Sequence, residues 1–246
     1  MQLKRGQFFI NQHYSSEFNV YIQNRPASVS ASRVIELRER EGNDSIIIDK
    51  AYYKNVTRKI ECYYKAPSID LVQEWEDRIT EWLDMNSYSD FILYYDQQYI
   101  YQAIVTEAPE FKGTRKTGNI VPFEFTVSLR PFKENYSGRF AIQQIKAIKL
   151  FNPEKYASKP LIKLSGSGDA SFYINNDKYD LKLLDRELYI DSKLEESYRK
   201  LDGNLEHQDH VTLFLDFPFL YPGKNEIKWT NNIHSFEIIP RWWRKV

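Results

Sequence analysis

Short runs of alternating or β-favouring residues recur along the first half of the chain and predict strands. These runs cover residues 7–10, 18–22, 33–40, 45–49, 56–64, 90–95, 99–107 and 120–129. We expect the first two runs to pair across the polar residues between them. Arg25-Pro26 should end that pairing, because proline has no N–H to donate to a strand ladder.

One segment has the period of a helix instead of a strand. Its apolar residues fall at i, i+3, i+7, i+10 and i+11, and they are Val72, Trp75, Ile79, Trp82 and Leu83. Asp70 with Gln73 resembles a capping box at its start. We expect this helix to pack its two tryptophans against the sheet.

Residues 33–40 and 45–49 flank Gly42-Asn43-Asp44 and predict a β-hairpin. So many charged residues in the first strand argue against a place on the core. The hairpin is therefore either an arm that projects and contacts a partner or a solvated hairpin that contacts nothing. For the first case the candidate interface residues are Glu36, Leu37, Arg38, Glu39, Arg40, Ile46 and Ile48.

The second half offers no comparable helix and predicts a β-sandwich from short strands with turn residues between them. The expected strands are 140–150, 159–164, 169–174, 179–184, 187–191, 211–214, 225–229 and 233–239. Ser165-Gly166-Ser167-Gly168 is interpreted as a turn. A polar segment at 133–138 indicates a boundary between an N-terminal domain (1–135) and a C-terminal domain (136–246). The predicted fold class is mostly β, an N-terminal β-sandwich with one helix and a projecting hairpin arm, followed by a second β-sandwich.

Composition narrows the class of protein. Hydrophobic residues make up 42% and aromatic residues 15% of the chain, which excludes a disordered protein. Lys+Arg and Asp+Glu both number 34, so no bulk charge attracts nucleic acid. No run approaches the ~20 apolar residues that span a bilayer, so we expect no membrane contact. The start of the chain lacks a signal-peptide core, and Cys62 is the only cysteine, which favours a buried thiol and folding in a reducing cytoplasm.

The candidates for chemistry are weak. His207-Gln208-Asp209-His210 lacks the further donors of the usual zinc sites, and Ser165–Gly168 precedes a strand where a phosphate loop needs a helix. No Gly-x-Ser-x-Gly elbow is present. We expect no enzyme activity, no catalytic residues, no metal and no cofactor. A glycosidase needs only two apposed carboxylates, which the sequence does not exclude.

Taken in order, these pieces resemble the distal tail protein (Dit) family of siphophages and their prophages. In the first half the resemblance rests on Phe8-Phe9-Ile10-Asn11, Ser16-x-Phe18-x-Val20, Arg25-Pro26, Ile60-Glu61-Cys62-Tyr63, Trp82-Leu83 and Arg130-Pro131-Phe132. In the second half it rests on Asn152-Pro153, Ser158-x-Pro160-x-Ile162-x-Leu164, Gly166-Ser167-Gly168-Asp169, Pro222-Gly223-x-Asn225-x-Ile227-x-Trp229 and Glu237-Ile238-Ile239-Pro240-Arg241-Trp242. The collinear order of the pieces, more than any one of them, carries the resemblance.

The resemblance implies a virion protein that forms a homo-oligomer, a hexameric ring at the phage tail tip, after synthesis in the bacterial host cytoplasm. N-terminal domains would line a channel, and galectin-like C-terminal domains would lie outside. The implied partners are the tail tube protein, the tail-associated protein and the tape-measure protein, and DNA would pass through without specific binding. A ring needs heterologous contacts, which the arm could supply by strand pairing.

Two alternatives stay open. A carbohydrate-binding β-sandwich module would present an exposed aromatic row and remain a monomer. A tail-associated glycosidase would hold two carboxylates in a deep cleft. The connections in the second half are short, so we expect no long inserted arm or sugar-binding module there.

Overall fold

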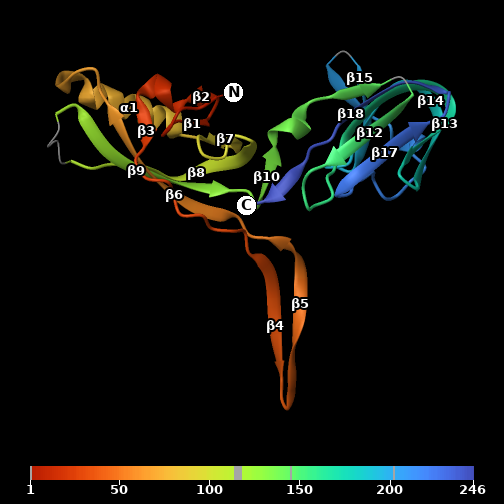
Figure 1. Ribbon diagram of the computed structural model, residues 1–246, viewed down its shortest axis with the longest axis horizontal. Helices are drawn as coiled ribbons and strands as arrows, with labels where there is room; N and C mark the ends of the chain where they lie inside the picture. Colours follow the sequence, from red (N-terminus) through yellow and green to blue (C-terminus); the bar gives the residue numbers. More distant parts are fainter. Residues whose placement is uncertain (1, 114–117, 145, 202) are drawn as a thin grey trace. The chain divides into compact units, whose positions relative to one another are not determined.

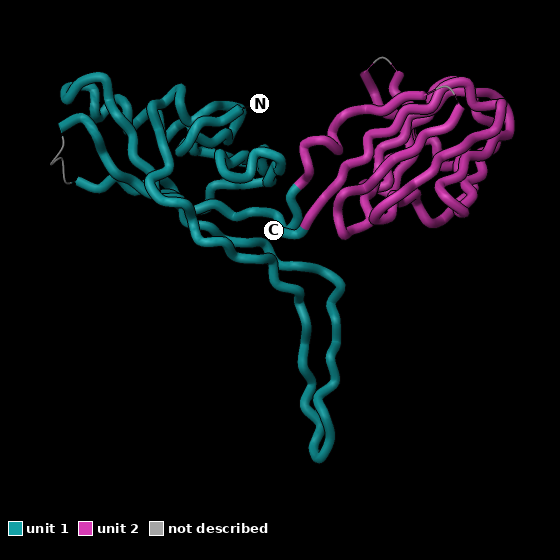
Figure 2. The backbone as a smooth tube through the Cα atoms, in the orientation of Figure 1, with its two compact units in different colours: residues 1–133, 245–246 teal, residues 134–244 magenta. Residues whose placement is uncertain are grey.

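The computed structural model describes residues 2–113, 118–144, 146–201 and 203–246, so part of the segment between the expected strands 99–107 and 120–129 lies outside the described residues. The chain divides into two compact units, residues 1–133 with 245–246 and residues 134–244 (Figure 2). The protein is mostly β with a single α-helix among the described residues, as predicted. The division into domains 1–135 and 136–246 stays a prediction.

Unit 1 is a curled antiparallel sheet with the order β2-β1-β7-β8-β9-β6-β3 (Figure 1). Its elements are β1 (Phe8–Ile10), β2 (His13–Tyr14), η1 (Ser15–Phe18), β3 (Val20–Ile22), β4 (Arg33–Arg40), β5 (Asn43–Tyr53), β6 (Val56–Lys65), η2 (Ile69–Leu71), α1 (Val72–Leu83), β7 (Ser89–Leu93), β8 (Tyr99–Phe111) and β9 (Ile120–Leu129). β10 (Phe132–Asn135) pairs with β8 and with β19 (Trp243–Lys245).

The helix has the bounds of the predicted apolar stripe and covers one face of the sheet. Trp82 stacks on Phe18 with ring centroids 4.4 Å apart, and its indole N–H donates to the carbonyl of Ile10 at 3.1 Å. The indole N–H of Trp75 donates to the carbonyl of Phe18 at 2.8 Å. Because both indole N–H groups have an acceptor, both tryptophans can pack against the core of unit 1. The expected packing of the two tryptophans is confirmed.

Two local expectations at this end of the chain are wrong. β1 and β3 do not pair with each other, because η1 and the left-handed Asn19 (φ 52°) redirect the chain between them. β1 pairs instead with β2 and β7, and β3 pairs with β6. Asp70 and Gln73 form no capping box, because η2 leads directly into α1 and the N-cap is Leu71, without a side-chain cap.

Unit 2 is a second curled sheet, in which β13 joins two layers. Its elements are η3 (Tyr136–Arg139), β11 (Ile142–Gln144), β12 (Ala147–Asn152), β13 (Leu161–Ile174), β14 (Asp177–Asp191), β15 (Glu196–Leu201), β16 (Asn204–His207), η4 (Asp209–Val211), β17 (Gly223–Trp229) and β18 (Ile233–Ile239). The first half of β13 pairs with β18 and the second half with β17, while β14 follows it along its whole length. Strands that change layers at a bend in this way form the corners of sandwiches.

The predicted turn at Ser165–Gly168 is wrong, because these residues lie inside β13. A Cβ on Gly166 would lie 2.2 Å from the carbonyl oxygen of Asn232, so glycine is required there by close approach. Gly168 has φ +73° and begins the bulge before Ala170. The two glycines therefore bend a continuous strand instead of ending it.

Other boundaries in unit 2 also differ. The expected strands 179–184 and 187–191 are one strand, β14. The expected strand 211–214 begins in η4, and its strand pairing consists of a single bridge between Leu181 and Thr212. β11 and β12 replace one expected strand at 140–150. β15 and β16 were not predicted, because their sequence is mostly polar and charged at the edge of the sheet.

Candidate functional site: the hairpin arm

The hairpin of β4 and β5 forms a sheet of its own, and no other strand of the described chain pairs with it. Figure 1 draws it as an arm that leaves the rest of unit 1, in agreement with the predicted projecting hairpin. Its turn lies at Glu41-Gly42, one step earlier than the sequence indicates, and Gly42 has φ +71°. Glycine accepts that left-handed backbone without strain.

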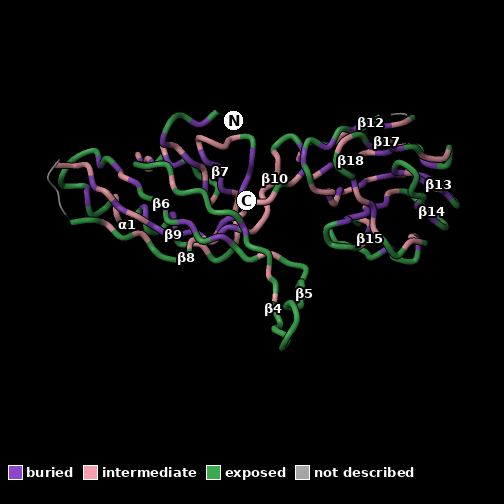
Figure 3. Tube along the Cα trace, turned by 60° about the horizontal axis from the view of Figure 1, so that its bottom comes forward, coloured by how far each residue is buried: buried purple, intermediate pink, exposed green. Residues whose placement is uncertain are grey.

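The register gives the arm two different faces. Ile35 and Leu37 share one face, because side chains two residues apart point the same way. Ile47 lies directly opposite Leu37 on that face, and Asp49 lies opposite Ile35. The three apolar residues Ile35, Leu37 and Ile47, which we call the apolar face, are 50%, 60% and 67% exposed. Nothing within the described part of the subunit covers them, and Figure 3 shows the arm as a largely exposed segment.

The opposite face of the arm carries charge. Glu36 lies opposite Ile48, and Arg38 lies opposite Ile46. The Lys50 ammonium lies 2.8 Å from one Glu36 carboxylate oxygen, and the Arg38 guanidinium lies 3.4 Å from the other. We call this the charged face. Such exposed ion pairs stabilise little by themselves and leave the face hydrated.

The predicted interface residues are thus divided between two faces. Leu37 belongs to the apolar face, and Glu36, Arg38, Ile46 and Ile48 belong to the charged face. Glu39 sits in an irregularity between Arg38 and Arg40, and the Arg40 Nε donates to the carbonyl of Asp44 at 3.2 Å near the turn. Whether these residues contact a partner stays a prediction.

The sequence interpretation missed Ile35, Ile47 and Lys50. The signal was the strict alternation of Ile35 and Leu37 in the first strand, which pairs with the Ile46-Ile47-Ile48 run in the second. Three consecutive isoleucines show no alternation of apolar and polar residues, so the strand register is needed to assign each one to a face.

The base of the arm is cross-linked by its own side chains and contacts the rest of unit 1 through Tyr53. The Arg33 guanidinium donates to the Asp49 carboxylate, and this hydrogen bond lowers the pKa of that carboxyl. Arg33 also donates to the Tyr53 hydroxyl at 3.3 Å, and the Tyr53 ring packs edge-on against Phe132 with centroids 5.4 Å apart. The arm therefore has a fixed base and an uncovered shaft.

The other sequence candidates do not assemble into a reactive centre. No group of three or more His, Cys, Asp or Glu residues that could hold a metal occurs among the described residues. His207 lies in β16, Asp209 and His210 lie in η4, and all three are exposed. Cys62 is fully buried in β6, and its burial raises the pKa of the thiol, so it remains protonated and a poor nucleophile. No helix in the described ranges is long and apolar enough to cross a membrane.

No protein-family model and no curated protein matches this chain. A solved structure does. The crystal structure of the Dit protein of SPP1, described as a paradigm of the hub adsorption apparatus in phages that infect Gram-positive bacteria, aligns with a TM-score of 0.72. The alignment covers 94% of this chain and 96% of that one at 10% identity. This chain has the fold of a phage Dit protein.

The resemblance predicted from the sequence is confirmed at the level of the fold. Two structures of the phage P2 baseplate in its activated conformation, one with Ca and one with Sr, also align over 93% of this chain at 8% identity. Their TM-scores are 0.47 and 0.49, too low to carry an argument.

Proposed function

We propose that this protein is a structural component of a siphophage tail tip, a distal tail protein that forms a hexameric ring in the virion. The ring joins the tail tube protein to the tail-associated protein and leaves a channel for the tape-measure protein and DNA. The observation that carries the proposal is the alignment with SPP1 Dit over 94% of the chain. An alignment of that extent spans both compact units.

The arm supports a role in assembly. A ring of identical subunits joins two different surfaces of each subunit, so every subunit must carry a donor patch and a receptor patch. The apolar face of Ile35, Leu37 and Ile47 is a donor patch with nothing covering it inside the subunit. Covering three such side chains on a neighbour would supply several kcal/mol, at about 1.5–3 kcal/mol for each fully buried residue.

We propose a structural role in preference to a catalytic one. Among the residues that the structure describes, no further metal donor joins His207, Asp209 and His210. Asp209 accepts a backbone hydrogen bond from Ser197 at 3.3 Å. The carbohydrate-binding and glycosidase alternatives account for unit 2 at most. They give no reason for the arm or for the extent of the alignment.

Light scattering on the purified full-length chain tests the proposal. We expect a hexamer at high protein concentration and low salt, with dissociation on dilution. A matched double variant, Leu37→Asp with Ile47→Asp, should reduce the hexamer, whereas Lys182→Asp on the unit 2 surface should not. A protein that stays strictly monomeric at high concentration contradicts the ring and favours a free sugar-binding module.

A further inference from the structure

Arg58 occupies a core-facing position in β6. The strand alternates between buried and exposed residues, and its buried positions are Val56, Arg58, Ile60, Cys62 and Tyr64. Arg58 is only 6% exposed, and its Nε has no hydrogen-bond partner. A buried guanidinium is costly unless an anion or another acceptor compensates for its lost hydration.

The surroundings of Arg58 add more positive charge. A cavity of about 160 Å³ is lined by Arg25, Arg58, Tyr95, Asp96, Tyr101 and Lys133, and we call it the cationic pocket. All of these residues belong to unit 1. Three cations and one carboxylate give a formal charge of 3 − 1 = +2 at the pocket.

The one carboxylate is already engaged. Asp96 accepts a hydrogen bond from the Lys133 ammonium at 2.5 Å and another from the Tyr101 hydroxyl at 2.5 Å. Burial and the neighbouring Asp96 raise the pKa of Tyr101, so the phenol stays a neutral donor. Neither Arg25 nor Arg58 forms an ion pair with any residue that the structure describes.

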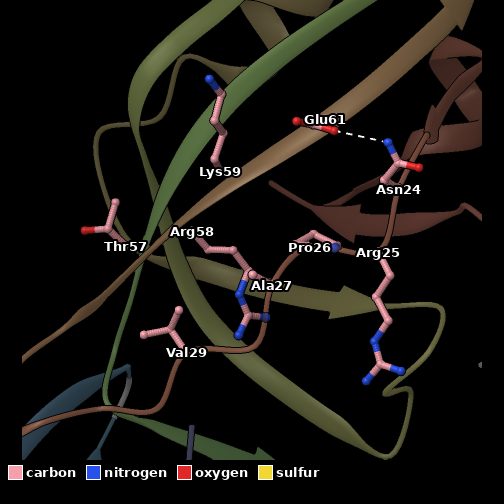
Figure 4. Close-up of a pocket in the computed structure, with 9 residues that line it drawn as sticks. All are labelled: Asn24, Arg25, Pro26, Ala27, Val29, Thr57, Arg58, Lys59 and Glu61. Atoms are coloured by element: carbon pink, nitrogen blue, oxygen red, sulfur yellow. Dashed lines mark hydrogen bonds between the residues drawn. The ribbon is translucent and has the colours of Figure 1, made fainter.

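Unused donors converge on the same place. The Tyr95 hydroxyl is buried without a hydrogen-bond partner, and the Arg25 guanidinium lies 4.5 Å from the centroid of the Tyr95 ring. Figure 4 shows Arg58 reaching from β6 to the segment that carries Pro26 and Ala27, from which Arg25 also extends. A hydrogen bond of 3.2 Å from the Asn24 amide to Glu61 ties that segment to β6.

We propose that the cationic pocket binds a single oxyanion of the carboxylate or phosphate class. Arg58, Arg25 and Lys133 supply positive charge, and the Tyr95 hydroxyl and the Arg58 Nε–H supply donors that have no other partner. A guanidinium matches the geometry of carboxylate and phosphate oxygens better than an ammonium does. The small volume limits the ligand to one such group, and the inference does not depend on the proposed tail-tip function.

Calorimetric titration of the full-length protein with inorganic phosphate, at constant ionic strength with chloride as the reference, tests the site. We expect saturable binding and a melting temperature raised by about 2–4 °C for the unit that holds the pocket. Arg58→Gln should lower the phosphate affinity about tenfold or more, because it removes charged hydrogen bonds to the anion. Arg78→Gln, which removes an exposed arginine on α1 outside the pocket, is the matched control and should bind like the wild type.

If Arg58→Gln does not fold, Arg25→Gln keeps the test decisive, because Arg25 is exposed and its loss leaves the core intact. Sedimentation velocity with and without phosphate distinguishes two sources of the anion. If phosphate dissociates an oligomer, the natural occupant of the cationic pocket is a carboxylate from a second copy of the chain. If phosphate binds without a change in sedimentation, the natural occupant is a free ion. Either of two results overturns the proposal. In the first, phosphate does not bind saturably and neither Arg58→Gln nor Arg25→Gln alters sedimentation. In the second, Arg58→Gln, Arg25→Gln and Arg78→Gln all bind phosphate equally well.

Discussion

Two of the long antiparallel hairpins in the described chain differ in what lies against their faces. The arm pairs β4 with β5, and the hairpin at the centre of unit 2 pairs β13 with β14. In β13 the inward side chains of Ile162, Leu164, Phe172 and Ile174 are fully buried. In the arm the side chains of the apolar face, Ile35, Leu37 and Ile47, are at least 50% exposed.

Both hairpins obey the same local rules, because each has β-favouring strands and a turn with a left-handed residue, Gly42 in one and Asn175 in the other. Pairing within a hairpin is therefore a local property, whereas burial depends on whether a second layer exists. In unit 2 the curled sheet supplies that layer itself, as the contact of Phe172 in β13 with Phe236 in β18 indicates. No described strand pairs with the arm. The apolar face of the arm is therefore the surface that the proposed ring contact would cover.

The largest contrast should appear on truncating one large apolar residue in each hairpin, the buried Phe172 in β13 and the exposed Leu37 in the arm. Phe172 stacks on Tyr179 and contacts Phe236, with centroids 4.9 Å and 5.6 Å away. Phe172→Ala should lower the free energy of unfolding of unit 2 by about 3–5 kcal/mol. Leu37→Ala should change the stability of the dissociated subunit by about 0.5 kcal/mol or less. Urea unfolding at a concentration where the protein is monomeric measures both, and an equal loss in Leu37→Ala would mean that the arm packs on its own subunit.

A smaller contrast is expected between the ion pairs of the two hairpins. Asp191, at the end of β14, accepts two hydrogen bonds from Arg241 at 2.6 Å and 2.9 Å. Burial raises the pKa of Asp191, but Arg241 and two backbone N–H groups outweigh burial and hold the pKa below its ordinary value of 3.8. Arg241→Gln leaves a buried carboxylate without its cation and should cost about 2 kcal/mol or more at neutral pH. Arg33→Gln removes the exposed pair of the arm and should change stability little.

The pH dependence gives that prediction a sign. Because the folded pKa of Asp191 is depressed, its pairing contributes fully above the unfolded pKa of about 3.9 and is lost as pH falls through the folded pKa. In Arg241→Gln only burial and the backbone N–H groups act on the pKa of Asp191. Protonation of Asp191 at low pH therefore relieves part of the cost of burying its carboxylate without a cation. The stability gap to the wild type should therefore narrow as the pH falls from 7 toward 4 in urea titrations. A gap that is constant or widens would contradict the assignment.

Parts of the fold were predictable where one periodic signal dominates. The five apolar positions of α1 keep helical spacing from Val72 to Leu83, and the bounds of β9 match the predicted strand 120–129. The errors in the predicted strands arose where the same residue type occurs in more than one structural setting. Glycines such as Gly166 mark turns in general, but here glycine permits close approach of Asn232 within a strand. β1 and β3 are close in sequence, yet β1 pairs with the remote β7 and β3 pairs with the remote β6, and no local pattern encodes that choice.

The candidate sites were predictable to different extents. The arm was predictable as a hairpin, because charge along a β-favouring strand excludes a place on the core. Its apolar face was not, since the exposure of Ile35 and Ile47 depends on register and on the absence of a covering layer. Arg58 stands in the inward positions of an alternating strand, so its burial was readable from the sequence. Its grouping with Asp96 and Lys133 required the tertiary fold.

The smallest effect on subunit stability should come from removing the shaft of the arm altogether. Replacing residues 36–46 with a short Gly/Ser turn takes away exposed side chains and leaves Arg33, Asp49 and Tyr53 at the base. The unfolding transition of the subunit should hardly change, because the core of unit 1 keeps α1 and its sheet. Assembly should weaken strongly, since in a closed ring each subunit gives one arm contact and receives another. Arg38→Glu with Arg40→Glu should act in the same direction but mildly, because exposed ion pairs contribute about 0–1 kcal/mol each. Sedimentation velocity beside thermal melting, for the wild type and both variants, separates the two readouts. If the replacement melts the subunit while surviving protein still forms rings, the arm belongs to the fold and the interface lies elsewhere.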